Sequence, residues 1–188
     1  ICCDPRLHYE DYKAGSAKLD ACMELVHGAL DGGHHILLFS QFTGMLDIIG
    51  KRLAKEDIGF LKLTGASSKE SRAKMVAQFQ AGEVPVFLIS LKAGGVGLNL
   101  TAADVVIHYD PWWNVAAQDQ ATDRAHRIGQ QHSVTVYKLI AKDTIEERIM
   151  QMQESKRDLV NSVLGGDGIS SALFTREDVL ALLGGDGR

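Results

Sequence analysis

The sequence contains little cysteine, which can form disulfide bonds, and little proline, which restricts the backbone. Only three of its 188 residues are cysteine and three are proline. Cys2 and Cys3 are adjacent and Cys22 stands alone, so no Cys-x-x-C spacing indicates a zinc or redox site. We interpret the three cysteines as reduced thiols, with Cys22 in a helix core. These features predict a cytoplasmic protein that folds without disulfide bonds.

Long apolar runs, clustered metal ligands and excess basic charge are also missing. No run approaches the roughly 18 apolar residues that span a membrane, and the first residues lack the pattern of a signal peptide. The seven histidines are scattered, so we predict no metal site. A net charge of -4 argues against a surface coated with cations for nucleic acid. It leaves open a local phosphate site built from backbone N–H groups.

Short apolar runs alternate with amphipathic stretches along the chain. Five short apolar runs are candidate strands: 35–40, 60–64, 86–90, 104–110 and 134–140. Most of them are near-continuous, as expected for strands buried on both faces of a parallel sheet. Helical patterns lie between them at 17–30, 43–56, 68–80 and 115–127. This alternation predicts βαβ units and a three-layer α/β fold with a mainly parallel sheet.

The C-terminal part predicts helices separated by a linker. A long amphipathic helix is expected over about 143–163, capped by Asp143 or Thr144. The stretch GGDGISSA then has the composition of a flexible linker. FTREDVLALL, residues 174–183, predicts a short helix capped by Thr175. Because the chain does not begin with Met, we expect it to be a fragment of a longer one.

Polar or glycine-rich segments follow four of the predicted strands. They are Ser40-Gln41, LTGASS at 63–68, SLKAGGVGLNL at 90–100 and DPWWN at 110–114. The carboxyl ends of parallel strands meet at one edge of a sheet, where α/β folds bind ligands. Structural explanations stay open, because Ser67 or Ser68 can cap helix 68–80 and Asn114 can cap helix 115–127. The glycine loop is neither a P-loop nor a dinucleotide fingerprint.

The stretch DQATDRAHRIGQQ, residues 119–131, places two arginines three positions apart before a glycine. On a helix, Arg124 and Arg127 share one face about one turn apart. One interpretation is structural, since Asp123 and Arg127 form an i,i+4 pair and cations stabilise a last helical turn. The other is functional, since two guanidinium groups suit phosphate oxygens.

Five segments together resemble a known family. In order they are ILLFSQF, LTGASSKESR, SLKAGGVGLNLTAADVVIHYDPWWN, DQATDRAHRIGQ and VYKLIAKDTIEERI. Their order and spacing resemble the second, C-terminal RecA-like lobe of the Swi/Snf family, helicase-like DNA-dependent ATPases of superfamily two. The resemblance covers about residues 16–164, and the tail resembles that of bacterial members. It implies an inter-lobe connection at 1–15, a RecA-like lobe at 16–164, and a linker with a short C-terminal helix at 165–188.

The resemblance implies a role for each matching position. The catalytic candidates are Arg124 and Arg127, whose counterparts reach the ATP phosphates across the cleft between lobes. The positions implied to lie near the nucleotide are Gly95, Gly97 and Gln120. The positions implied to contact DNA are Ser40, Gln41, Gly65, Ser67, Ser90, Lys92, Trp113 and Asn114. Val115, where the family usually has Pro, and Gln118, where it often has Glu, depart from the family pattern, as does LTGAS.

The resemblance also implies cofactors and partners. ATP with Mg²⁺ is the expected cofactor, with the Mg²⁺ ligands on a first lobe that this chain lacks. No Walker A lysine and no Asp-Glu box occur in the sequence, so the isolated lobe is predicted to be inactive. Double-stranded DNA and the first RecA-like lobe are the expected partners, and a protein substrate or a polymerase is a further candidate; no membrane is expected.

Two other functions fit parts of the sequence. A non-catalytic regulatory or protein-binding α/β module would keep the lobe fold without the motor. An RNA helicase lobe would share the superfamily motifs. The tandem tryptophans and the string Ala-His-Arg-Ile-Gly-Gln favour the Swi/Snf interpretation. Upstream P-loop and Asp-Glu-x-His motifs would separate a motor from a module.

Overall fold

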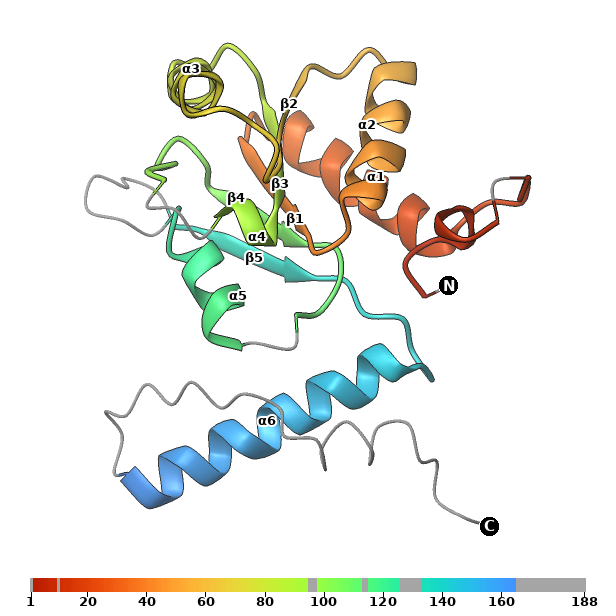
Figure 1. The fold of residues 1–188 in the computed structure, drawn as a ribbon, viewed down its shortest axis with the longest axis vertical. Coiled ribbons are helices and arrows are strands. Elements are labelled where there is room, and N and C mark those ends of the chain that lie inside the picture. The colour runs from red at the N-terminus through yellow and green to blue at the C-terminus, as the bar shows by residue number, and fades with distance from the viewer. Residues whose placement is uncertain (1, 10, 95–97, 113–114, 126–132, 165–188) are drawn as a thin grey trace.

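The computed structural model describes residues 2–9, 11–94, 98–112, 115–125 and 133–164, which form an α/β fold around one parallel sheet (Figure 1). The strands are β1 Ile36–Ser40, β2 Phe60–Leu63, β3 Val86–Ser90, β4 Val105–His108 and β5 Thr135–Lys138. All neighbouring strands are parallel, in the order β2-β3-β1-β4-β5. The predicted strands and the parallel sheet are therefore confirmed.

Helices cover both faces of the sheet, which confirms the three-layer prediction (Figure 1). They are α1 Ala17–Asp31, α2 Thr43–Lys55, α3 Lys69–Gln80, α4 Leu91–Gly94, α5 Val115–Thr122 and α6 Ile145–Leu164, with a 3₁₀ turn at Pro5–Leu7. Helices α1 and α2 pack on one face, against Ile36 and Leu38. Helix α3 packs on the other, against Leu37 and Phe39. Alternate residues of a strand point to opposite faces, so a continuous apolar run contributes side chains to the hydrophobic core on each face of the sheet.

Burial differs between the central and edge strands. Every residue of β1, β3 and β4 is buried, as predicted. Strand β5 differs, because Thr135, Tyr137 and Lys138 are exposed. Strand β2, at the other edge, exposes Lys62. Position in the sheet causes the difference, because an edge strand has a neighbour on one side only.

Several predicted helix ends are confirmed and one is wrong. The Ser68 hydroxyl accepts a hydrogen bond from the Ser71 N–H at 3.2 Å, so Ser68 caps α3. The Thr144 hydroxyl accepts one from the Glu146 N–H at 3.2 Å, at the start of α6. Helix α5 ends at Thr122, whereas the sequence predicted a helix to 127. The predicted helix at 174–183 lies outside the described residues.

His108 makes the stability of this fold sensitive to acid. Its imidazole is 1% exposed, stacks on Phe39 and lies 3.0 Å from the Thr122 hydroxyl. Burial, helped by nearby Lys138, lowers its pKa from 6.5 to about 4. The folded state therefore binds fewer protons than the unfolded state between these values, and stability falls as pH drops through this window.

We expect His108→Gln to remove this acid sensitivity. Between pH 7 and pH 5 the wild-type imidazole should lower the free energy of unfolding by about 2 kcal/mol. Burial raises the pKa of Asp110 to about 6, which has the opposite sign, but the variant keeps Asp110. Urea unfolding of both proteins at the two pH values isolates the difference. Parallel pH profiles would contradict the assignment.

Candidate functional site

The carboxyl ends of the strands meet at one edge, as predicted. Ser40, the last residue of β1, pairs in register with Ser90, the last residue of β3. On the other side of β1, the N–H of Tyr109 donates to the Phe39 carbonyl at 2.9 Å. Asp110 follows directly. The segments that follow β1, β3 and β4 therefore start side by side.

The turn after β1 is held by the segment after β4. The Ser40 hydroxyl donates to the Asp110 carboxylate, and the Gln41 N–H donates to the same group at 3.0 Å. The Gln41 side-chain amide donates to the Pro111 carbonyl at 3.2 Å. Burial raises the pKa of Asp110 to about 6, and the two hydrogen bonds oppose that shift. Ser40 is thus turned inward, while Phe42, at 44% exposure, reaches solvent.

The turn after β2 is held by an arginine that sequence reasoning missed. The Arg72 guanidinium donates to the carbonyls of Ser67, Thr64 and Gly65, at 3.0, 3.3 and 3.4 Å. The Ser67 hydroxyl accepts from the Thr64 N–H at 3.1 Å. Gly65 is exposed with open space around its Cα. The signal available in the sequence was a lone arginine one turn inside the helix that follows the turn.

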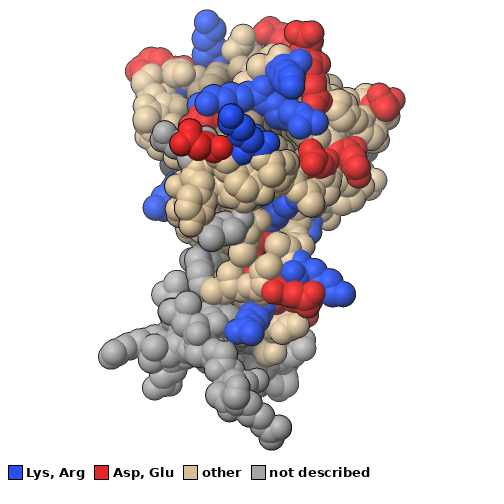
Figure 2. Space-filling view, turned by 90° about the vertical axis from the view of Figure 1, so that its right-hand side faces the viewer, with Lys and Arg blue, Asp and Glu red and all other residues tan. Residues whose placement is uncertain are grey.

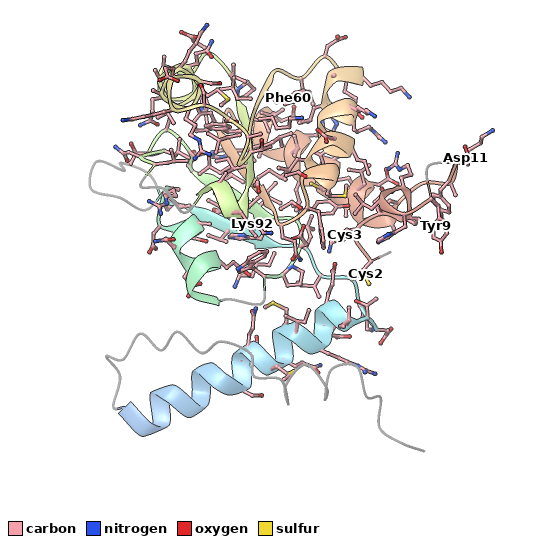
Figure 3. The ribbon with its side chains drawn as sticks, in the orientation of Figure 1. Cys2, Cys3, Tyr9, Asp11, Phe60 and Lys92 are labelled. Atoms are coloured by element: carbon pink, nitrogen blue, oxygen red, sulfur yellow. The ribbon has the colours of Figure 1, made fainter. Side chains whose placement is uncertain are left out.

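The segment after β3 begins with a helical turn that the sequence did not predict. Helix α4 carries Lys92, which is exposed at the carboxyl edge of the sheet (Figure 3). Ser90 is only 2% exposed. Gly95 and Gly97 lie outside the described residues. The edge therefore presents Lys92 as a cation next to two turns built largely from backbone.

The structure describes two of the residues predicted to approach the nucleotide, Gln120 and Arg124. Gln120 is exposed on α5. Arg124 follows the end of that helix, and its side chain is 2% exposed. Its carbonyl accepts from the Leu100 N–H at 3.2 Å, which ties it to the segment after the glycine loop. Arg124 does not lie on the predicted helix, because α5 ends at Thr122, and its side chain is buried. Arg127, Trp113 and Asn114 lie outside the described residues.

A buried ionic cluster lies beside this edge, and sequence reasoning missed it. Lys18 of α1 pairs with Glu146 of α6, with side chains 8% and 6% exposed. The Lys18 ammonium also lies 5.2 Å from the centre of the Tyr109 ring. The Cys3 thiol donates to Glu146 at 3.7 Å, and its carbonyl accepts from the Tyr109 hydroxyl at 2.9 Å. The cluster fastens the N-terminal segment and α6 to the same end of β4.

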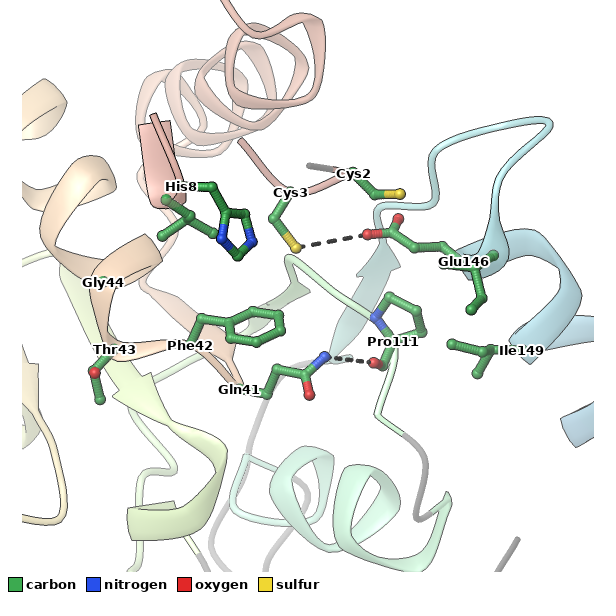
Figure 4. Close-up of a pocket in the computed structure, with 12 residues that line it drawn as sticks. Cys2, Cys3, His8, Gln41, Phe42, Thr43, Gly44, Pro111, Glu146 and Ile149 are labelled. Atoms are coloured by element: carbon green, nitrogen blue, oxygen red, sulfur yellow. Dashed lines mark hydrogen bonds between the residues drawn. The ribbon is translucent and has the colours of Figure 1, made fainter. Parts of the chain in front are cut away.

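A cavity of about 460 Å³ opens next to this cluster (Figure 4). The N-terminal segment, the start of α2, Pro111 and the start of α6 line it. Burial raises the pKa of the Cys3 thiol at its wall to about 12, so this thiol stays protonated and is a poor nucleophile. Gln41 reaches the cavity from the turn after β1. The cavity therefore lies beside the carboxyl edge, among the N-terminal segment, α2 and α6.

Charge on the described surface is mixed rather than uniformly basic. On the face shown in Figure 2, acidic side chains lie among the basic ones. On α2 and β2, Arg52 pairs with Glu56 and Lys62 pairs with Asp47. Within the described ranges, no three His, Cys, Asp or Glu side chains come together as metal ligands. In the same part of the chain, no helix has the length and apolar character to cross a membrane.

The sequence matches the family described as helicase conserved C-terminal domain over residues 17–129. The chain belongs to this family. It is 46% identical over 168 residues to an uncharacterized ATP-dependent helicase of Mycoplasma pneumoniae, covering 89% of this chain and 16% of the relative. It is 42% identical over 185 residues to the putative ATP-dependent helicase/translocase YwqA of Bacillus subtilis, covering 94% of this chain and 20% of the relative. The chain thus spans a fifth or less of these relatives.

Solved structures agree with the family assignment. The Sulfolobus solfataricus SWI2/SNF2 ATPase core in complex with dsDNA is 38% identical, with a TM-score of 0.73 over 94% of this chain and 38% of that one. The C-terminal part of the Fun30 ATPase domain is 37% identical, with a TM-score of 0.71 over 80% of this chain and 51% of that one. The chain is a C-terminal RecA-like lobe of the Swi/Snf type, and the resemblance inferred from the sequence is confirmed.

The buried pair Lys18–Glu146 should contribute far more to stability than an exposed pair. We expect Lys18→Ala to lower the free energy of unfolding by about 3–5 kcal/mol, because it leaves the Glu146 carboxylate buried without its cation. Lys62→Ala is the matched control, since Lys62 and Asp47 are 40% and 52% exposed. The control should cost less than about 1 kcal/mol. If chemical denaturation showed the same loss of unfolding free energy in both variants, the buried pair would not be more stabilising than the exposed one.

Proposed function

We propose that this chain is the C-terminal motor lobe of an ATP-dependent DNA translocase or remodelling ATPase. One observation carries the proposal: the segments after β1, β2 and β3 form one continuous edge in a lobe that is 38% identical to an ATPase core solved with dsDNA. Relatives named ATP-dependent helicase and chromatin-remodeling ATPase support the use of ATP. Three reduced cysteines fit our expectation of a cytoplasmic location.

The proposed DNA contacts are to the backbone of the duplex. Ser40 and Ser90 are buried, so we assign contact to the turns that they anchor rather than to their hydroxyl groups. Gln41, Gly65, Ser67 and Lys92 face this edge from those turns, and Trp113 and Asn114 follow β4 in the sequence. Contacts from backbone groups and a lone cation carry no sequence information. A net charge of -4 makes such binding weak for the lobe alone.

The proposed nucleotide site is shared with a first RecA-like lobe. Gly95, Gly97 and Gln120 would lie near the nucleotide, and Arg124 and Arg127 would complete the site. A guanidinium group that meets the transferring phosphoryl group stabilises the charge that develops there. We expect the carboxylate ligands of Mg²⁺ on the other lobe. Bound Mg²⁺ would neutralise phosphate charge.

Loss of either arginine should abolish ATP turnover in a polypeptide that carries both lobes. We expect Arg127→Ala to lower DNA-stimulated hydrolysis by roughly 10³–10⁵-fold, the contribution of an arginine finger. Arg127→Lys should rescue poorly, because an ammonium is a point charge without a planar fork. Arg124→Ala should also lower the unfolding temperature, since its side chain is buried. Steady-state ATPase assays and thermal melts separate these effects.

The isolated chain is the control for this assay, and we expect it to hydrolyse no ATP. Turnover by the pure isolated chain would contradict the need for a first lobe. Near-normal turnover in both alanine variants would return the two arginines to the structural interpretation, in which they stabilise a helix end.

Lys92 should contribute to DNA affinity without regard to base sequence. In the two-lobe polypeptide, we expect Lys92→Ala to weaken binding similarly on unrelated duplexes. The slope of log affinity against log salt should become shallower by about 0.9, as for one lost phosphate contact. Lys55→Ala is the matched control, because Lys55 is exposed at the opposite end of α2 from this edge. Fluorescence anisotropy at several salt concentrations measures the affinity and the salt slope of each variant. A loss of affinity confined to one DNA sequence would refute contact with the DNA backbone.

A further inference from the structure

The Asp110 carboxylate occupies an unusual place for a charged group. It follows β4 at the carboxyl edge of the sheet and is 1% exposed. Burying a carboxylate destabilises its charged form unless nearby groups compensate. Lys18 of α1 favours the charge, whereas Glu146 of α6 opposes it. The Cys3 thiol of the N-terminal segment also faces this group. Nothing in the packing of the sheet itself requires a carboxylate here.

The Asp110 carboxylate contacts the turn that follows β1. One oxygen accepts from the Ser40 hydroxyl and the other from the Gln41 N–H. The Ser40 oxygen in turn accepts from the Phe42 N–H at 3.1 Å. The carbonyl of the next residue, Pro111, accepts a hydrogen bond from the Gln41 side-chain amide. The segment after β4 therefore bonds both the backbone and the side chain of Gln41.

We propose that Asp110 is a positioning residue that holds the Ser40–Gln41 turn in the conformation that contacts DNA. This inference rests on the proposed function, and it adds a residue that does not itself reach the duplex. The Ser40 hydroxyl and the Gln41 N–H both donate to residue 110, so this residue must present two acceptor atoms. A carboxylate has two acceptor oxygens, whereas an amide has one. Helix α2 starts two residues after Gln41 without a side-chain cap, so the turn also sets the direction of its first N–H groups.

Asp110→Asn in the two-lobe polypeptide tests the inference. The amide keeps the shape but offers one acceptor, so the Ser40 hydroxyl and the Gln41 N–H can no longer both donate to it as they do to the carboxylate. We expect roughly tenfold weaker binding to a fluorescein-labelled duplex, measured by anisotropy at constant ionic strength. The amount of DNA needed for half-maximal hydrolysis should rise by the same factor, while turnover at saturating DNA stays unchanged. A residue that only stabilised the fold would not separate these two quantities.

Asp104→Asn is the matched control at the other end of the same strand. Asp104 precedes β4 and accepts from the N–H of His35, just before β1, at 3.1 Å. It also lies 2.7 Å from the Nδ1 atom of His34. Both carboxylates accept from a backbone N–H at an end of β1, but Asp104 lies at the amino edge of the sheet, away from the proposed DNA contacts. We expect a loss of stability with no change in DNA affinity.

The pH dependence of DNA binding gives a second test that needs no folded variant. Protonation turns one carboxylate oxygen into a donor and has the same effect as the amide. Because burial raises the pKa of Asp110 to about 6, wild-type affinity should fall as pH drops through 6. The Asp110→Asn variant should lack this step. If it does not fold, the wild-type step near pH 6 decides, and its absence overturns the inference.

The remaining outcomes separate the inference from the function on which it rests. Wild-type protein without DNA affinity at any pH overturns the proposed function and this inference with it. Wild-type binding with an equal affinity for Asp110→Asn overturns the inference alone. Equal losses in Asp110→Asn and Asp104→Asn also overturn it, because the effect would then follow from general destabilisation of β4.

Discussion

The pairing of β1 with both β3 and β4 determines where every candidate contact lies. Residues 36–40 of β1 pair in register with 86–90 of β3 and, over four residues, with 105–108 of β4. Parallel strands in register end together, so their following segments share one edge. Strand β1 is also fully buried, and apolar packing on both faces fixes that register. A slip by one residue would scatter Ser40, Ser90 and Asp110.

The turns at this edge are rigid because other parts of the lobe hold them. Asp110 bonds the turn after β1, and Arg72 bonds three carbonyls of the turn after β2. Preorganised groups bind without a further loss of conformational freedom, which favours contact with a regular backbone such as DNA. Asp110 is buried and Arg72 is half-buried, and each one bonds backbone groups of a turn at this edge.

The sequence predicted the fold better than the site, for a physical reason. Continuous apolar runs and period-3.6 patterns report burial, and they located all five strands. Of the two serines offered as a cap, Ser68 caps α3. They did not report that β5 lies at an edge, because sheet order is a tertiary property. They also missed the bonds from Asp110 and Arg72, since the Asp110 bonds join residues about 70 positions apart. The sequence placed Arg124 inside a helix, because the predicted helix ran to residue 127, whereas α5 ends at Thr122.

The Arg124 backbone joins two segments of the lobe. Its carbonyl accepts from the Leu100 N–H, so the segment after α5 is bonded to a residue that follows α4 in the chain. Under the proposed function, the first segment meets ATP phosphate and α4 carries Lys92 toward DNA. Packed elements shift between discrete arrangements rather than deform gradually. On that proposal, the bond between Arg124 and Leu100 is one place where phosphate contact and DNA contact would be coupled within one lobe.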